Sequence, residues 1–140
     1  MSGEFIDTNV FVYLFDETDG RKRSKAKEIV RTALETRSAR ISHQVVQETL
    51  NVVTRKLPTP MTAEQAKHFL EYVLMPLWQV MPSQTLYHRG LDIQGRFGFS
   101  FYDSLIVAAA LESGATRLYS EDMQDGQQIE GLTIENPFKN

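Results

Sequence analysis

The chain contains no cysteine, which excludes disulfide bridges, thiolate zinc sites and a cysteine nucleophile. Long hydrophobic runs are also absent. The longest ones, Leu105–Leu111 and Val10–Phe15, are far shorter than the ~20 apolar residues that a membrane-spanning helix needs. The N-terminus lacks the charged and then apolar pattern of a secretory signal. We therefore expect no membrane association and take the cytoplasm as the default location.

Several nucleotide-binding and hydrolase motifs are missing as well. The sequence has no G-x-G-x-x-G loop, no P-loop and no G-x-S-x-G elbow. Its three histidines, His43, His68 and His88, do not have the spacing of paired metal ligands. These absences argue against dinucleotide binding, P-loop chemistry and a serine nucleophile.

The net charge of −3 does not mark the chain as an electrostatic binder of nucleic acid. Basic residues are nevertheless concentrated in one stretch, which contains Arg21, Lys22, Arg23, Lys25, Lys27, Arg31, Arg37 and Arg40. Two interpretations remain open. These residues form either a solvated helix face or a rim that faces phosphate groups.

The 140 residues, of ordinary globular composition, predict one domain in which strands alternate with helices. Strands are expected at 3–7, 39–42, 78–81, 117–120 and 132–135. Helices are expected at 9–15, 21–37 and 43–57, then after caps at Thr62, Ser83 and Ser100. Met75, Trp78 and Met81 are expected in the core. The alternation predicts a parallel sheet covered by helices on both faces.

Acidic residues at the ends of these elements are the most informative feature. Asp7 closes the first strand, Asp122 follows the fourth, and Asp103 opens an apolar helix. In a parallel sheet these positions meet at the carboxyl edge of the strands. Two carboxylates 4 Å apart repel by roughly 4 kcal/mol at an effective dielectric of 20. A divalent cation such as Mg²⁺ removes this cost, so the pattern predicts a metal-dependent enzyme that acts on phosphates.

Asp7 and Asp103 also have simpler explanations. Asp7 could cap the first helix, although Thr8 could do so as well and leave Asp7 free for a metal. Asp103 stands three residues after Ser100, which is the spacing of a capping box, and an acid in the first turn favours the helix dipole.

The other two acids are weaker signals when taken singly. Glu48 lies at the edge of an apolar helical stripe, where an ordinary boundary glutamate would look the same. Asp122 belongs to a polar turn with Glu121 and Asp125, and turns are rich in aspartate for local reasons. Spacing alone does not determine which of these three acids points inward.

Four segments together carry a more specific signal. They are Phe5-Ile6-Asp7-Thr8-Asn9-Val10, the helical Glu48, Tyr102-Asp103-Ser104 before an alanine-rich helix, and Ser120-Glu121-Asp122. In this order and at this length they resemble the PIN-domain ribonucleases, and most closely the VapC-type toxins of bacterial toxin–antitoxin pairs.

The resemblance implies a single PIN-like nuclease domain over residues 1–140. Its fold would be a three-layer α/β/α sandwich with a mostly parallel sheet of about five strands in the order 3-2-1-4-5. It also implies an endoribonuclease that hydrolyses RNA with Mg²⁺ or Mn²⁺. VapC-like proteins usually form homodimers and are inhibited by a small antitoxin protein, so both partners are expected here.

By position, Asp7, Glu48 and Asp103 match the three core acids of that family, and Asp122 matches the more variable fourth. Asp125 is an alternative fourth acid, because many relatives carry an aspartate at that place. The resemblance makes Asp7 and Asp103 the principal metal ligands, with Glu48 and Asp122 bound directly or through water. Thr8, Asn9 and Ser120 match supporting polar positions.

Two other classes of protein are alternatives. A phosphoacceptor receiver domain would need an adjacent acidic pair after the first strand, but Asp7 is followed by Thr8 and Asn9. It would also need a lysine after the last strand, and Lys139 lies beyond a proline in the tail. A catalytically silent PIN-like binding module is the second alternative, and the presence of all four acids speaks against it.

Overall fold

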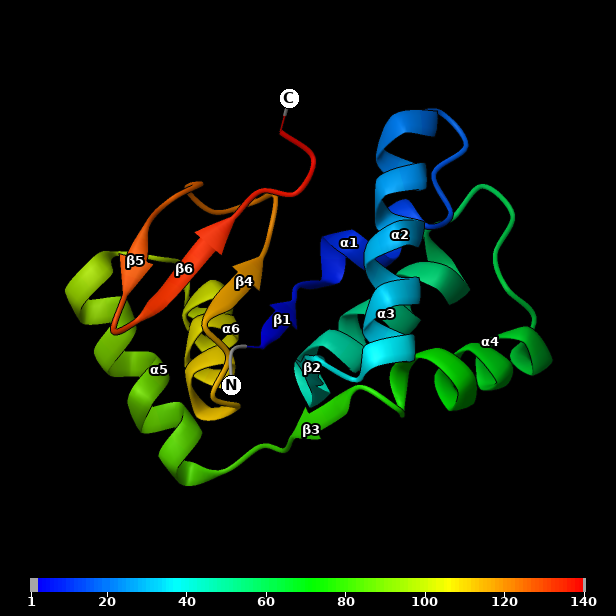
Figure 1. The fold of residues 1–140 in the computed structure, drawn as a ribbon. Coiled ribbons are helices and arrows are strands. Elements are labelled where there is room, and N and C mark those ends of the chain that lie inside the picture. Colours follow the sequence, from blue (N-terminus) through cyan, green and yellow to red (C-terminus); the bar gives the residue numbers. More distant parts are fainter. Residues whose placement is uncertain (1–2, 140) are drawn as a thin grey trace.

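The computed structural model describes residues 3–139, in which strands alternate with helices along the chain (Figure 1). The strands of this part are β1 (Glu4–Ile6), β2 (Ala39–Ser42), β3 (Trp78–Val80), β4 (Arg117–Tyr119), β5 (Gln128–Ile129) and β6 (Leu132–Glu135). The helices are α1 (Thr8–Tyr13), α2 (Gly20–Thr36), α3 (His43–Arg55), α4 (Ala63–Phe69), the π-helix η1 (Leu70–Leu74), α5 (Gln84–Phe97) and α6 (Phe101–Glu112). The predicted α/β class is confirmed.

The strands form one sheet in the order β3-β2-β1-β4-β6-β5. The pairs β1–β2, β1–β4, β2–β3 and β4–β6 are parallel, whereas β5 pairs with β6 in antiparallel fashion. The predicted order 3-2-1-4-5 is confirmed, since the predicted fifth strand is β6. The two-residue β5 was not expected, because so short a strand shows no alternating pattern in the sequence.

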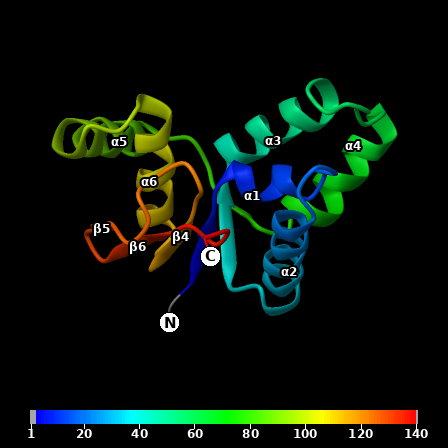
Figure 2. The same ribbon diagram turned by 90° about the horizontal axis from the view of Figure 1, so that it is seen from above.

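The helices lie on both sides of the sheet. From above, α1 to α4 are together on one side of the molecule and α5 and α6 on the other, with β1 and β2 between them (Figure 2). Right-handed crossovers explain this division. The chain moves in one direction across the sheet from β1 through β2 to β3, and it returns from β3 to β4 over the opposite face. The expected three-layer arrangement is therefore present.

Side-chain caps place the starts of the helices. The hydroxyl groups of Ser83 and Ser100 accept hydrogen bonds from the backbone N–H groups of Leu86 and Asp103, at 3.0 and 3.1 Å. Thr62 forms a reciprocal capping box with Gln65. The predicted caps are thus confirmed, and the Ser100 cap sets where Asp103 stands on α6.

Helix α6 is buried on nearly all sides, as its apolar sequence predicts. Every residue from Ser104 to Ala110 is buried. The expectation for two methionines is wrong: Met75 and Met81 are 52% and 58% exposed. They flank β3, which is the edge strand of the sheet, so side chains beside it are not covered by a further strand.

A close contact between α5 and α6 yields a first prediction. A Cβ at Gly90 would come within 2.7 Å of Leu105 Cδ2, whereas a Cβ at Gly95 on the same helix would meet nothing within 4 Å. Gly95→Ala should therefore stabilise the fold by roughly 0.5–1 kcal/mol through helix propensity. Gly90→Ala should instead lose about 1–3 kcal/mol by overpacking. Urea unfolding of both variants measures this, and equal effects would contradict the packing.

Candidate active site

Asp7 lies at the carboxyl end of the central strand β1 and is only 4% exposed. Its Oδ1 accepts a hydrogen bond from the Thr8 backbone N–H at 2.7 Å, and its Oδ2 accepts one from the Ser120 hydroxyl at 2.8 Å. Of the two residues that could cap α1, Asp7 and Thr8, it is Asp7 that does so. Each carboxylate oxygen keeps a further lone pair, so capping leaves Asp7 able to bind a cation.

Glu48 is held on α3 by two neutral donors. The Thr8 hydroxyl donates to Glu48 Oε1 at 2.7 Å, and the Gln44 amide donates to Oε2 at 3.3 Å. The same amide also donates to the backbone carbonyl of Tyr102 at 3.1 Å. Gln44 thereby joins Glu48 on α3 to the first turn of α6, where Asp103 follows Tyr102.

Asp122 lies just beyond β4 and is held by Asn9 and by Ser120, which also bonds to Asp7. The side-chain Nδ2 of Asn9 donates to Asp122 Oδ2 at 3.1 Å, and its side-chain Oδ1 accepts from the Glu121 backbone N–H at 3.3 Å. The hydroxyl of Ser120 accepts from the Asp122 N–H at 3.3 Å while it donates to Asp7. Asn9 and Ser120 therefore tie the turn after β4 to the end of β1.

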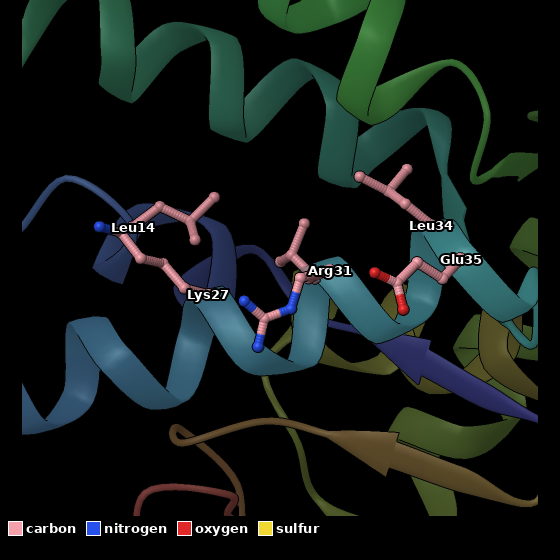
Figure 3. A pocket seen from close by; sticks show the side chains of 6 residues that line it. Leu14, Lys27, Arg31, Leu34 and Glu35 are labelled. Carbon is pink, nitrogen blue, oxygen red and sulfur yellow. The ribbon is translucent and has the colours of Figure 1, made fainter.

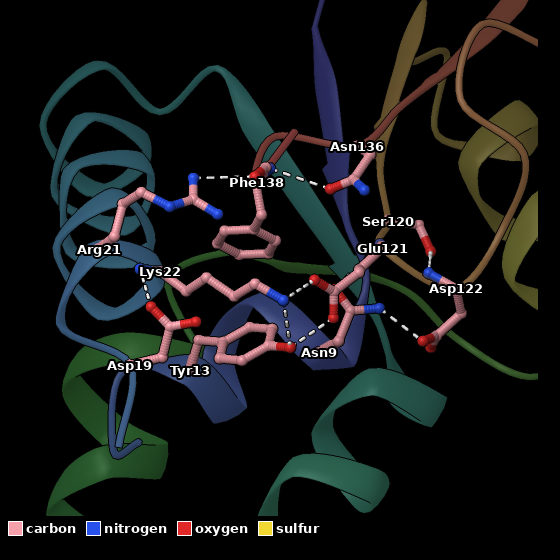
Figure 4. A network of polar contacts seen from close by, with 10 residues as sticks. All are labelled: Asn9, Tyr13, Asp19, Arg21, Lys22, Ser120, Glu121, Asp122, Asn136 and Phe138. Atoms are coloured by element: carbon pink, nitrogen blue, oxygen red, sulfur yellow. Dashed lines mark hydrogen bonds and ion pairs between the residues drawn. The ribbon is translucent and has the colours of Figure 1, made fainter. Parts of the chain in front are cut away.

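The neighbouring acids of this turn have other partners. Glu121 forms an ion pair with Lys22 and accepts a hydrogen bond from the Tyr13 hydroxyl, as Figure 4 shows. Asp125 accepts from the Asn136 N–H at 2.8 Å and pairs with Lys139 at 3.0 Å. Asp122 bonds instead to a neutral amide and shares Ser120 with Asp7, so it is Asp122, and not Asp125, that is linked to Asp7.

The charges of Asp122 and Glu48 act on both Asp7 and Asp103, and we call these four residues the acidic cluster. Burial, with help from the charges of Asp122 and Glu48, raises the pKa of Asp7 to about 7, although hydrogen bonds from Ser120 and Thr8 lower it. Burial and then the charges of Asp122 and Glu48 also raise the pKa of Asp103. The pKa of Asp125 is lowered instead, by the Asn136 N–H and Lys139.

The acidic cluster suits a hard divalent cation in its donor atoms. Within residues 3–139, the ion pairs of the structure involve other acids, so no lysine or arginine pairs with these four carboxylates. The same residues contain no group of three His, Asp or Glu side chains already close enough to hold a metal. Mg²⁺ does not require such a cage, because it usually binds one or two carboxylates and keeps several waters.

The acids do not line the hollows found on the surface. One open hollow of about 470 Å³ lies along α2 and is lined by Leu14, Lys27, Val30, Arg31, Leu34 and Glu35 (Figure 3). Another, of about 420 Å³, lies near the ends of α1 and α3 and includes Phe15, Arg23 and Lys56. Neither of these two hollows contains a residue of the acidic cluster.

Sequence reasoning missed three residues that organise this edge. Gln44 had no signal beyond its place one turn before Glu48, which is the spacing of a helical pair. Tyr13 and Lys22 are separated from Glu121 by 108 and 99 residues, so no local pattern connects them. Their roles follow only from the packing of α1 and α2 against the turn after β4.

A family model for the PIN domain matches residues 5–124, so this chain belongs to the PIN domain family. The predicted family resemblance is confirmed. Among curated proteins, no sequence matches this chain. Within residues 3–139, no helix combines the length and apolar character needed to cross a membrane.

Solved structures share the fold over almost the whole chain. A toxin–antitoxin complex from Klebsiella pneumoniae has 20% identity and a TM-score of 0.68, covering 96% of this chain and 98% of its own. VapC20 from Mycobacterium tuberculosis, a toxin that cleaves the sarcin-ricin loop, has 20% identity and a TM-score of 0.61, covering 89% and 92%. DNA-bound VapBC from Salmonella typhimurium has 19% identity and a TM-score of 0.65, covering 96% and 98%. At identities of 19–20%, the likeness shows a shared fold and nothing further about this chain.

The raised pKa of Asp7 predicts how the stability of the metal-free protein depends on pH. The pKa is 3.8 in the unfolded chain and about 7 in the folded one, so between these values only the folded state keeps the proton. Stability should fall as the pH rises through this range, by up to about 4 kcal/mol. Asp7→Asn removes the effect, so its Tm should exceed that of the wild type at pH 8 but not at pH 4.

Thermal unfolding in EDTA measures this difference. Asp125→Asn is the matched control, because the lowered pKa of Asp125 stabilises the fold above its unfolded pKa and that stability is lost as the pH falls. This control should therefore be less stable than the wild type at pH 8. A Tm difference for Asp7→Asn that does not change with pH would contradict the raised pKa.

Proposed function

We propose that this protein is a metal-dependent endoribonuclease that hydrolyses phosphodiester bonds of RNA, and that it acts as the toxin of a VapBC-type toxin–antitoxin pair. The main support is the acidic cluster at the carboxyl edge of the sheet. The charges of Asp122 and Glu48 help to raise the pKa of Asp7 and Asp103, yet the side-chain hydrogen bonds to Asp7, Glu48 and Asp122 come from neutral donors. This arrangement is unfavourable unless a cation joins it. Membership of the PIN domain family and the fold shared with VapC toxins support the same proposal.

The chain's own residues would prepare the site in three ways. Ser120 and the Thr8 N–H orient Asp7, and its burial limits competition from bulk water. Thr8 and Gln44 hold Glu48 from two sides. Asn9 holds Asp122 across from them. Because these donors are neutral, they set the direction of the carboxylates without cancelling their charge.

In this proposal Asp7 and Asp103 hold the cation, Mg²⁺ or Mn²⁺, and Glu48 and Asp122 bind it directly or through water. When bound, the cation would supply a hydroxide nucleophile at neutral pH and offset charge on the scissile phosphate. The proton on Asp7 must leave before its carboxylate can act as a ligand, since ligands bind in their deprotonated form. With a pKa of about 7, Asp7 can lose it near neutral pH.

Cleavage of RNA tests the proposal directly. Wild type should cut a labelled single-stranded RNA with Mg²⁺ or Mn²⁺ and should not cut it in excess EDTA. Asp7→Asn and Asp103→Asn should each reduce the rate at least about 100-fold, because even residues that only orient a ligand cost 10–100-fold when lost. Asp125→Asn is the control within the same turn and should stay within a few-fold of wild type. Undiminished cleavage in EDTA would exclude the proposed metal mechanism.

The supporting role of Asn9 can be tested separately. Asn9→Ala removes the bonds to Asp122 and to the Glu121 N–H, so the turn after β4 should lose its fixed position. We expect about a 10-fold weaker Mn²⁺ affinity by isothermal titration, with little change in Tm. Asn9→Asp should not rescue it, because a fifth carboxylate would repel Asp122. Wild-type affinity in Asn9→Ala would show that Asn9 has no part in the site.

The toxin assignment needs its own experiment. Expression of the wild type in a bacterial host should arrest growth, and Asp103→Asn should relieve the arrest. Co-expression of a small protein encoded beside this gene should suppress toxicity and co-purify with the chain. A homodimer of this chain is part of the proposal, and light scattering measures it. The alternative of a silent binding module predicts instead that wild type neither cleaves RNA nor binds Mn²⁺.

A further inference from the structure

The charged residues of helix α2 are placed opposite to the arrangement that the helix dipole favours. α2 carries six basic and two acidic residues, a net charge of +4, although the whole chain has −3. Its first turn contains no acid and its last turn no base. Basic residues at a helix N-terminus add to the positive end of the helix dipole and are unfavourable there. Departures from local preference of this kind are expected at functional sites.

The structure separates the basic residues of α2 by what they contact. Lys22 forms an ion pair with Glu121, and Arg23 lines the hollow near the ends of α1 and α3. Lys27 and Arg31 line a hollow with three apolar side chains and Glu35 (Figure 3). Arg21 and Lys25 instead line a hollow of about 520 Å³ with Ser24, Glu28, Pro137 and Lys139. We call this last hollow the basic groove.

The cations of the basic groove remain available to a ligand. Lys25 and Glu28 are 3.9 Å apart with side chains 42% and 63% exposed, so their pairing in water is weak. Lys139 pairs with Asp125 but keeps 65% of its side chain exposed. The Arg21 Nη1 donates to the Phe138 carbonyl at 2.9 Å, a neutral acceptor that leaves the charge of Arg21 uncompensated.

The basic groove is joined to the acidic cluster by a short series of contacts. Arg21 holds the backbone at Phe138, whose ring packs against Tyr13 at 4.7 Å between centroids. Lys22, next to Arg21, binds Glu121, and Asp122 follows Glu121 in the chain (Figure 4). On the other side, Lys139 binds Asp125 of the same turn. The groove therefore borders the segment that carries Asp122.

We propose that the basic groove of Arg21, Lys25 and Lys139 binds the phosphate backbone of single-stranded RNA beside the acidic cluster. The proposal rests on the ribonuclease function above and adds where the strand lies. Four carboxylates repel a polyanion, so a nuclease of net negative charge needs a separate positive surface to retain its substrate. Contacts from lysine and arginine to phosphate groups carry no sequence information, so binding through such contacts depends little on sequence.

The test is the salt dependence of binding to a fluorescein-labelled single-stranded RNA, followed by anisotropy in EDTA so that no cleavage occurs. The double variant Lys25→Gln/Lys139→Gln should bind about 10-fold more weakly near 0.1 M salt. Its slope of log K against log salt should be smaller by about 1.4, that is about 0.7 for each lost phosphate contact. Arg21→Gln removes one contact and should reduce the slope by about 0.7, and Arg21→Lys should recover most of the affinity.

The matched control is Lys56→Gln/Lys67→Gln, which removes the same charge from two exposed lysines elsewhere in the chain. Its affinity and salt slope should equal those of the wild type. Equal losses in both double variants would overturn the proposal, because binding would then follow net charge alone. Absence of RNA binding by the wild type would overturn it as well. Groove-dependent binding of poly-glutamate that is tighter than binding of the RNA at equal charge would assign the groove to an acidic protein instead.

Cleavage kinetics distinguish a failure of the groove from a failure of the ribonuclease proposal. If both proposals hold, the groove variants raise KM for RNA and leave kcat unchanged. If the groove variants cleave and bind RNA normally, the groove proposal is wrong and the ribonuclease proposal stands. If the wild type binds RNA through the groove but does not cleave it, the groove proposal stands and the ribonuclease proposal is wrong.

Discussion

Repulsion among four carboxylates is the constraint on which the functional edge of this molecule depends. Parallel strands bring their carboxyl ends to one edge, and the chain places Asp7 after β1 and Asp122 just beyond β4. Glu48 and Asp103 reach the same region from α3 and α6. Burial and mutual charge raise the pKa of Asp7 and Asp103, which records the free-energy cost of this arrangement. Carboxyl groups with raised pKa values concentrate at functional sites, and the proposed cation would offset the cost.

Neutral hydrogen-bond donors hold the carboxylates in position without neutralising their charge. Thr8, Asn9 and Ser120 each link two parts of the edge, and Gln44 connects Glu48 to the start of α6. A lysine or arginine in any of these places would stabilise the metal-free protein and also occupy the site of the cation. Basic side chains do occur nearby, but they bind Glu121 and Asp125, the two acids of the turn that point elsewhere. The turn after β4 thus separates acids that stabilise the fold from the acid offered to the site.

This separation joins the acidic cluster to the C-terminal tail and to α2. Lys22 lies over the rings of Tyr13 and Phe138, at 4.9 and 5.9 Å from their centroids, while it binds Glu121. The carbonyl of Phe138 and the carboxylate of Asp125 fix the tail on either side. The positive end of α2 is thereby held against the negative edge of the sheet. In the proposed function, a polyanionic strand at this edge would meet both charges, the positive one at its phosphates and the negative one through the cation.

The order of the elements, the helix caps at Thr62, Ser83 and Ser100, and the burial of α6 were all predictable from the sequence, because periodicity and capping act over a few residues. The choice of Asp7, Glu48, Asp103 and Asp122 as candidates was also predictable, and their catalytic roles stay a prediction. Only the tertiary structure decided that Asp7 caps α1, that Lys22 forms an ion pair with Glu121, and that Asp125 forms one with Lys139. It also decided that Met75 and Met81 are exposed beside an edge strand. These outcomes depend on pairings between residues far apart in the chain and on strand order, and no local pattern records either one.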